Sequence, residues 1–146
     1  GNIWKPVSAD EAKFSMTYAL AKALQNGTYT LDDLEDCKNM GPETSRLIDK
    51  MEIIPDSFYE NKQDHIRGCH VALIMENGQV LETSRLLPKG DPETPLTEAD
   101  MMGKMSACCN GIYDRTVQSD IQKCIMQDET LDLSHLFQIL HLYTNM

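Results

Sequence analysis

The chain of 146 residues has few basic residues: 13 lysines and arginines stand against 23 aspartates and glutamates, and the formal net charge is −10. Proteins that bind nucleic acids need a basic surface to replace the counterions of the phosphates, so this class is excluded. The same acidity disfavours docking on an anionic membrane surface. An anionic substrate would be bound only where some of the lysines face one cleft.

The sequence also lacks a long apolar run. No stretch approaches the roughly 18 apolar residues that cross a bilayer as a helix. The first residues, GNIWKPV, show no basic segment followed by an apolar one, so no signal peptide is predicted. Apolar residues make up 41% of the chain and charged residues 25%, which is typical of a globular domain. We therefore expect a single domain over residues 1–146, without a membrane partner.

Motifs for metals, disulfides and nucleophiles are absent as well. The five cysteines form no C-x-x-C pair, which favours reduced thiols and a cytoplasmic protein. No histidine stands at ligand spacing with a cysteine or carboxylate cluster, so neither a metal nor a cofactor is expected. There is no G-x-S-x-G sequence and no cysteine in a His-paired context, which argues against nucleophilic catalysis.

The clearest predicted element is a helix over residues 8–26. Ser8, followed three residues later by Glu11, fits a capping box, and Gly27 stands where a glycine commonly ends a helix. Apolar residues cover most of the helix circumference, which predicts burial on more than one side.

Three polar side chains on this helix, Lys13, Ser15 and Tyr18, have two interpretations. In the first, the lysine keeps its ammonium in water and the tyrosine is a core residue that bonds its hydroxyl locally. In the second, the ammonium and hydroxyl groups are buried, and a carboxylate-rich substrate supplies the partners that they need. The residues alone leave both interpretations open.

A β-hairpin is predicted over about 66–87. Asn77-Gly78 is a preferred pair for a two-residue turn, and apolar runs flank it on both sides. This turn places Met75 opposite Val80 and Leu73 opposite Glu82, and we expect helices to cover one face of the sheet. A short strand over 51–54 is predicted as a third member.

Short helices account for most of the remaining chain. Thr30 caps a helical turn over 30–36, and Pro42 opens a helix that ends near Lys50. Thr97 and Asp100 cap a helix that runs to about Ile112 after the tight turn KGDPETP. Two further helices are predicted over 116–127 and 131–143, the last with Leu133, Leu136, Phe137 and Leu140 at core spacing. Helices, then an antiparallel sheet, then helices indicate an α+β fold.

Three segments together resemble the MmgE/PrpD family, which includes 2-methylcitrate dehydratase, cis-aconitate decarboxylase and iminodisuccinate epimerase. They are EAKFSMTYALAKAL at 11–24, HVALIMENGQVLE at 70–82 and KGDPETPLTEADMMGK at 89–104. The resemblance covers residues 8–112, and the helices over 116–143 are compatible with it. It implies that the chain is the lid-containing C-terminal part, while a helical domain carries the principal acid–base residues. Mild departures are Met105, where phenylalanine commonly follows the motif lysine, and Glu93-Thr94.

The resemblance further implies a lyase or isomerase that moves a proton α to a carboxylate of a small polycarboxylate, without a required metal. Tyr18 matches a tyrosine at the active-site rim of cis-aconitate decarboxylase, and Lys13 matches a position that is often basic. Both are expected to be catalytic, and Lys13, Ser15 and Tyr18 to bind substrate. The isolated chain is expected to be inactive without the helical catalytic domain, in the same or a separate chain. A homodimer is a further expectation, since relatives tend to be dimers. The alternative is a free-standing binding or assembly domain without catalytic activity.

Overall fold

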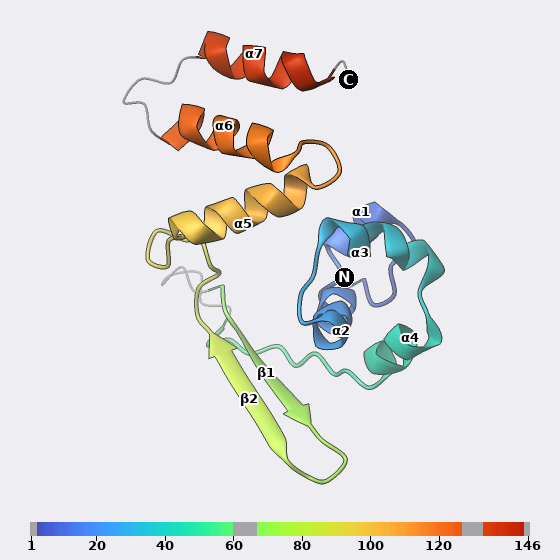
Figure 1. Ribbon diagram of the computed structural model, residues 1–146. Coiled ribbons are helices and arrows are strands. Elements are labelled where there is room, and N and C mark those ends of the chain that lie inside the picture. Colours follow the sequence, from blue (N-terminus) through green and yellow to red (C-terminus); the bar gives the residue numbers. More distant parts are fainter. Residues whose placement is uncertain (1–2, 60–66, 127–132, 145–146) are drawn as a thin grey trace. The chain divides into compact units, whose positions relative to one another are not determined.

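The computed structural model describes residues 3–59, 67–126 and 133–144. Over these residues it has an α+β fold, as predicted, with seven α-helices, a short 3-10 helix and one two-stranded antiparallel sheet (Figure 1). The chain divides into two compact units, residues 1–54 and 55–146. None of the helices in the described part of the chain is long and apolar enough to cross a membrane.

The first unit consists of short helices. These are α1 (Ala9–Lys13), α2 (Met16–Asn26), α3 (Leu31–Asp36), the 3-10 helix η1 (Cys37–Asn39) and α4 (Pro42–Asp49). Three of the predicted ends are confirmed: Gly27 ends α2 with a left-handed φ of 74°, Thr30 and Asp33 form a capping box on α3, and Pro42 occupies the first turn of α4.

The predicted single helix over 8–26 is broken at Phe14 and Ser15. Ser15 has an extended backbone (φ −94°, ψ 101°), and its Oγ accepts a hydrogen bond from the Tyr18 amide at 3.2 Å, so it caps a new helix. Phe14 is 78% exposed. The apolar pattern alone did not reveal the break, because a serine inside a run of good helix formers fits either an interior or a cap position.

The core of the first unit lies between α2 and the surrounding helices. Its buried residues are Ala12, Tyr18, Ala21, Cys37 and Ile48. The rings of Tyr18 and Tyr29 meet edge to face, with centroids 6.1 Å apart and an interplanar angle of 81°. Each large side chain buried in this way contributes roughly 1.5–3 kcal/mol.

Residues 51–54 form no strand, in contrast to the prediction. The Met51 amide donates to the Ile48 carbonyl at 3.0 Å, so the backbone leaves α4 through a last helical turn. Ile54 is largely exposed, and the sheet of the described residues consists of the two hairpin strands only. The apolar residues of this segment favour a strand, but a strand needs a neighbouring strand to satisfy its backbone hydrogen bonds.

The hairpin of the second unit is present, with β1 (Cys69–Ile74) and β2 (Val80–Arg85), but its register differs by one residue from the prediction. Ile74 pairs with Val80, and Leu73 with Leu81. The turn has three residues: the Gly78 amide donates to the Met75 carbonyl at 2.9 Å, and Gly78 is left-handed with φ 84°. Such a turn with a bulge is the next most common hairpin connection. In this register Leu81 lies opposite Leu73 and on the same face of the sheet, whereas the prediction placed the two leucines on opposite faces.

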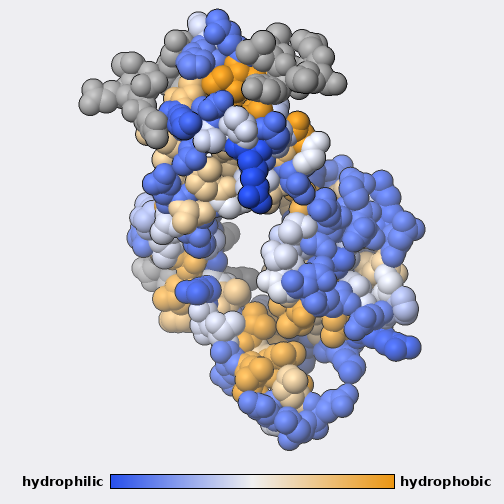
Figure 2. Space-filling view, viewed as in Figure 1, coloured by the Kyte–Doolittle hydropathy of each residue, from blue (hydrophilic) through white to orange (hydrophobic). Residues whose placement is uncertain are grey.

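The hairpin is exposed over most of its surface. Only Val71 and Leu73 are half-buried, and every residue of β2 is exposed. Ile74 is 75% exposed, and Figure 2 shows apolar residues gathered on the hairpin. The burial of the strands therefore does not show the helical cover that was expected on one face.

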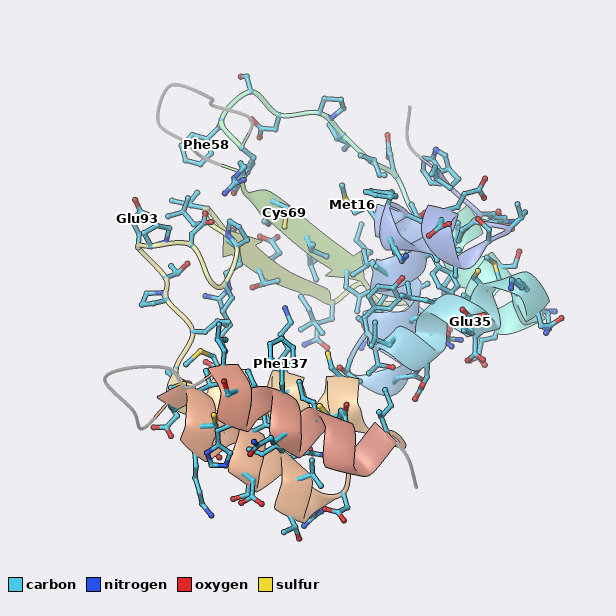
Figure 3. All side chains as sticks on the ribbon, turned by 90° about the horizontal axis from the view of Figure 1, so that it is seen from above. Met16, Glu35, Phe58, Cys69, Glu93 and Phe137 are labelled. Atoms are coloured by element: carbon cyan, nitrogen blue, oxygen red, sulfur yellow. The ribbon has the colours of Figure 1, made fainter. Side chains whose placement is uncertain are left out.

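Three helices follow: α5 (Glu98–Cys109), α6 (Arg115–Met126) and α7 (Leu133–Thr144). Thr97 and Asp100 form the predicted capping box, and α5 ends at Cys109, short of Ile112. The core consists of Val117, Ile121, Cys124 and Ile139, with Leu136 and Leu140 packed against it. Leu133 and Phe137, predicted as core residues, are exposed; Figure 3 labels Phe137 on α7. The buried stripe of α7 therefore lies nearer to Ile139 than the spacing of its leucines suggested.

Candidate functional site

Lys13 is the last residue of α1 and the predicted site residue that solvent reaches. Its side chain is 52% exposed, and its Nζ lies 2.9 Å from Oδ1 of Asp10 one turn earlier. The hydrogen bond and the charge of Asp10 raise the pKa of the Lys13 ammonium above its ordinary value. A cation at a helix C-terminus is also favoured by the helix dipole. Lys13 therefore offers a positive charge beside the bend between α1 and α2.

Ser15 has its hydroxyl inside the first unit. Its Oγ donates to the Ile3 carbonyl at 2.7 Å and accepts from the Tyr18 amide at 3.2 Å, and the residue is 2% exposed. The one hydroxyl proton is therefore used by the backbone of the N-terminal segment. Ser15 fixes the bend beside Lys13.

Tyr18 is the largest buried side chain of this region, with 1% exposure. Its hydroxyl donates to the Asp33 carbonyl at 2.6 Å, which joins α2 to α3. Burial raises the pKa of Tyr18 to about 12, against the opposing charge of Lys22. The phenol is therefore neutral near pH 7, and its proton is held by a backbone oxygen.

An ion network that the sequence did not reveal lies next to Tyr18. Lys22 is 14% exposed, and its Nζ lies 3.0 Å from Oδ1 of Asp33 and 3.4 Å from Oδ2 of Asp36. Oδ2 of Asp33 accepts from the Thr30 amide at 2.8 Å, and Oδ1 accepts from the Asn26 amide group at 3.1 Å. Lys22 follows Tyr18 by four residues, one helical turn, and this spacing was the signal that could have found it.

The pKa values of both charged partners are shifted by their surroundings. Burial acts against charge on Asp33, but hydrogen bonds from Thr30 and Lys22 outweigh it and lower the pKa of the carboxyl. Burial also acts against charge on Lys22, yet the bonds and charges of Asp33 and Asp36 raise the pKa of its ammonium. The pair is thus ionised at neutral pH and needs both members.

A cleft of about 670 Å³ opens beside this network, between α2, η1 and α4. Tyr18, Lys22, Gln25, Asp36 and Glu43 contribute to its lining, whereas Lys13 and Ser15 do not. The structure therefore brings the three predicted site residues to one bend but only Tyr18 to the cleft. Because Lys22 is already neutralised, the cleft as it stands favours a neutral polar group over a polycarboxylate.

The second unit has polar contacts at its surface. In the KGDPETP turn, Gly90 has a φ of 105° and its amide donates to the Thr94 carbonyl at 2.8 Å, as expected of a tight turn. Arg67 binds the Asp91 carboxylate at 2.9 Å, and Lys89 binds that of Asp100 at 2.5 Å. Across the described ranges, no group of three or more His, Cys, Asp or Glu side chains is placed to hold a metal ion.

The fold and the site together define an α+β domain that offers binding groups at a bend and a cleft. Residues 1–129 match the MmgE/PrpD C-terminal domain, and the chain belongs to this family. The match confirms both the family and the C-terminal part that the resemblance indicated, and it extends beyond residues 8–112 on both sides. A comparison with curated proteins gives no match.

Proposed function

We propose that this chain is the lid-containing part of an MmgE/PrpD-type lyase or isomerase. Its substrate is a small polycarboxylate, and the reaction moves a proton α to one of the carboxylates. The principal base comes from a helical catalytic domain, in the same chain or in a separate one. The chain alone is inactive. The family match supports this proposal. We also propose a cytoplasmic location, because the cysteines show no disulfide pattern.

Lys13 is the residue that we assign to direct contact with the substrate. Its exposed ion pair with Asp10 is of a kind that contributes little to stability, so a substrate carboxylate can replace Asp10. When a base removes the α proton, charge moves onto that carboxylate, and a nearby ammonium stabilises it. Closing of the lid would exclude water and strengthen this interaction.

Ser15 and Tyr18 remain in the proposed site with supporting roles. Their hydroxyl protons are held by the Ile3 and Asp33 carbonyls, so direct contact with a substrate would require these bonds to break. In their present positions they hold the start of α2, and with it the place of Lys13. A catalytic role for Tyr18 would need the bond to Asp33 to open on substrate binding.

Deuterium exchange tests the proposal directly. The 146-residue chain would be incubated in D₂O with cis-aconitate, 2-methylcitrate and iminodisuccinate, alone and with the helical catalytic domain, and the α-proton signals followed by NMR. We expect loss of an α-proton signal only when both parts are present. Exchange by the chain alone, or by no combination, would contradict the proposal.

A matched pair of lysines tests the role of Lys13. Lys13→Ala is expected to lower kcat/KM on the order of a hundredfold, the effect of removing one electrostatic stabiliser, while Lys13→Arg retains the charge and most of the activity. Lys38→Ala is the control, because Lys38 is also exposed and also pairs with a carboxylate three residues earlier, Glu35. Equal effects of Lys13→Ala and Lys38→Ala would remove Lys13 from the site.

The exposed hairpin favours the second candidate, a binding or assembly domain. Both strands expose apolar residues, and the outer edges of a two-stranded sheet carry unpaired backbone groups. A two-stranded hairpin is only marginally stable by itself in water, so this surface fits contact with another protein surface. A stable complex of this chain with another protein, whose affinity does not change when a polycarboxylate is added, would support this candidate over the lid.

A further inference from the structure

A strap of five residues, 3–7, lies along the start of α2. Two hydroxyls hold it: Ser15 Oγ donates to the Ile3 carbonyl at 2.7 Å, and Thr17 Oγ1 donates to the Trp4 carbonyl at 2.6 Å. Both residues are 2% exposed, and their oxygens are 3.3 Å apart. The two hydroxyls therefore act on adjacent peptide groups of one segment.

Two exposed contacts, weaker because water reaches them, follow further along the strap. Lys5 Nζ lies 2.6 Å from Oδ1 of Asp49 on α4, and the Val7 amide donates to the Glu11 carboxylate at 2.8 Å. The chain then enters α1 directly through Ser8. The path of the strap thus sets the point at which α1 begins.

Helix α1 has only five residues, and it is held by these attachments and by Ala12, which is buried in the core and whose carbonyl accepts from the Tyr29 hydroxyl at 2.9 Å. A helix this short is not stable by its own hydrogen bonds. The strap fixes its first residue, and the Ser15 cap fixes the bend after its last residue, Lys13. Ser15 turns inward at that bend, whereas its two neighbours in the chain, Phe14 and Met16, are exposed. Figure 3 labels Met16 at the start of α2.

We propose that Thr17 is a positioning residue for Lys13 and that it acts through the strap. The hydroxyl of Thr17 is not needed for the backbone hydrogen bonds of α2. A buried hydroxyl is unfavourable unless it forms a hydrogen bond. Its bond to Trp4 fixes the strap, the strap fixes α1, and α1 presents the Lys13 ammonium. The inference rests on the proposed function for the role of Lys13, but the attachment of α1 can be measured without it.

Hydrogen exchange of the 146-residue chain tests the attachment. Thr17→Val keeps the side-chain shape and removes the hydroxyl, and we expect the hydrogen-bonded amides of Glu11, Ala12 and Phe14 to exchange about tenfold faster. Thr17→Ser restores the hydroxyl and should exchange like the parent chain. Thr44→Val is the matched control: Thr44 is also buried in this unit, but its hydroxyl bonds to Gln25 and not to the strap. Unchanged exchange in Thr17→Val, or an equal change in Thr44→Val, would overturn the attachment.

A double-mutant cycle in the presence of the helical catalytic domain tests the positioning. Thr17→Val should lower kcat/KM in the parent and have no further effect in Lys13→Ala, because it acts through Lys13. Additive losses would overturn the positioning role even if α1 exchanges faster. A silent Lys13→Ala would overturn both the positioning and the proposed substrate contact, whereas the exchange result would still stand for the strap.

Discussion

The same local device occurs in each unit, in two different environments. Thr30 with Asp33 caps α3, and Thr97 with Asp100 caps α5; each aspartate accepts from the threonine amide, at 2.8 and 3.0 Å. Each aspartate also binds one lysine, Lys22 in the first unit and Lys89 in the second. Lys22 is 14% exposed and Lys89 is 64% exposed. The same threonine–aspartate–lysine arrangement is thus buried in one unit and open to water in the other.

This difference shows that a capping motif does not by itself indicate how much a site depends on it. In water, the ions of a broken pair are hydrated again, so an exposed pair contributes little. In the interior, removal of one partner leaves the other charged and without hydration. We therefore expect Asp33 to support the α2–α3 side of the candidate site, and Asp100 to adjust the start of α5 only slightly.

The largest expected effect on stability comes from the buried capping box of Thr30 and Asp33. Asp33→Asn leaves Lys22 with Asp36 alone, and it should lower the free energy of unfolding by about 3 kcal/mol. Asp100→Asn, the same change in the exposed box, should have a much smaller effect. Urea unfolding of the two variants and the parent at pH 7 provides the measurement. Equal losses in both variants would show that burial does not separate the two sites.

A smaller effect is expected from Tyr18→Phe, which removes the bond to the Asp33 carbonyl. The buried carbonyl loses its partner, so the loss should be about 1–2 kcal/mol at pH 7. The variant also tests the pKa of Tyr18, which is about 12 in the folded chain and roughly 10 when unfolded. A raised folded pKa gives stability that is complete below pH 10 and is lost as the pH rises through about 12.

The alkaline part of that prediction has a clear readout. Unfolding in urea would be measured from pH 8 to pH 11.5 in the parent and in Tyr18→Phe. The parent should lose stability more steeply above pH 10, so that the two curves converge. Tyr29 supplies a residual slope in both proteins, because burial raises the pKa of its phenol as well. Parallel curves would mean that Tyr18 ionises as readily in the folded chain as in the unfolded one.

Sequence reasoning found the elements whose signals are local. The Thr30 cap, the Thr97 box, Gly27 and Pro42 were each identified from a few neighbouring residues, because capping depends on neighbouring backbone groups. The hairpin was also found, but its register was not, since the pair Asn77-Gly78 fits both a two-residue and a three-residue turn. The prediction of a strand over residues 51–54 was wrong, because a strand pairs with residues that are distant in the sequence.

The candidate site was predictable only in part, for the same reason. Lys13, Ser15 and Tyr18 come to one bend, but the Ile3 and Asp33 carbonyls that bind two of them lie 12 and 15 residues away in the chain. No spacing rule connects such distant partners. The ion pair of Lys22 with Asp33 depends on the packing of α2 against α3, which the sequence pattern leaves unspecified.

The smallest expected effect concerns the exposed box and the acid side of the pH range. The hydrogen bond from Lys89, followed by those from Thr97, lowers the pKa of Asp100 from 3.8 to about 2. A lowered folded pKa gives stability that is present above about pH 3.8 and is lost as the pH falls through about 2. Lys89→Met should raise the pKa of Asp100, and carboxyl-carbon NMR between pH 1.5 and pH 6 would measure it. Added salt should raise it in the parent as well, since screening weakens exposed pairs. An Asp100 pKa that responds to neither change would mean that the Thr97 hydrogen bonds alone hold it low. The two capping boxes would then differ in the effect of their lysines as well as in their burial.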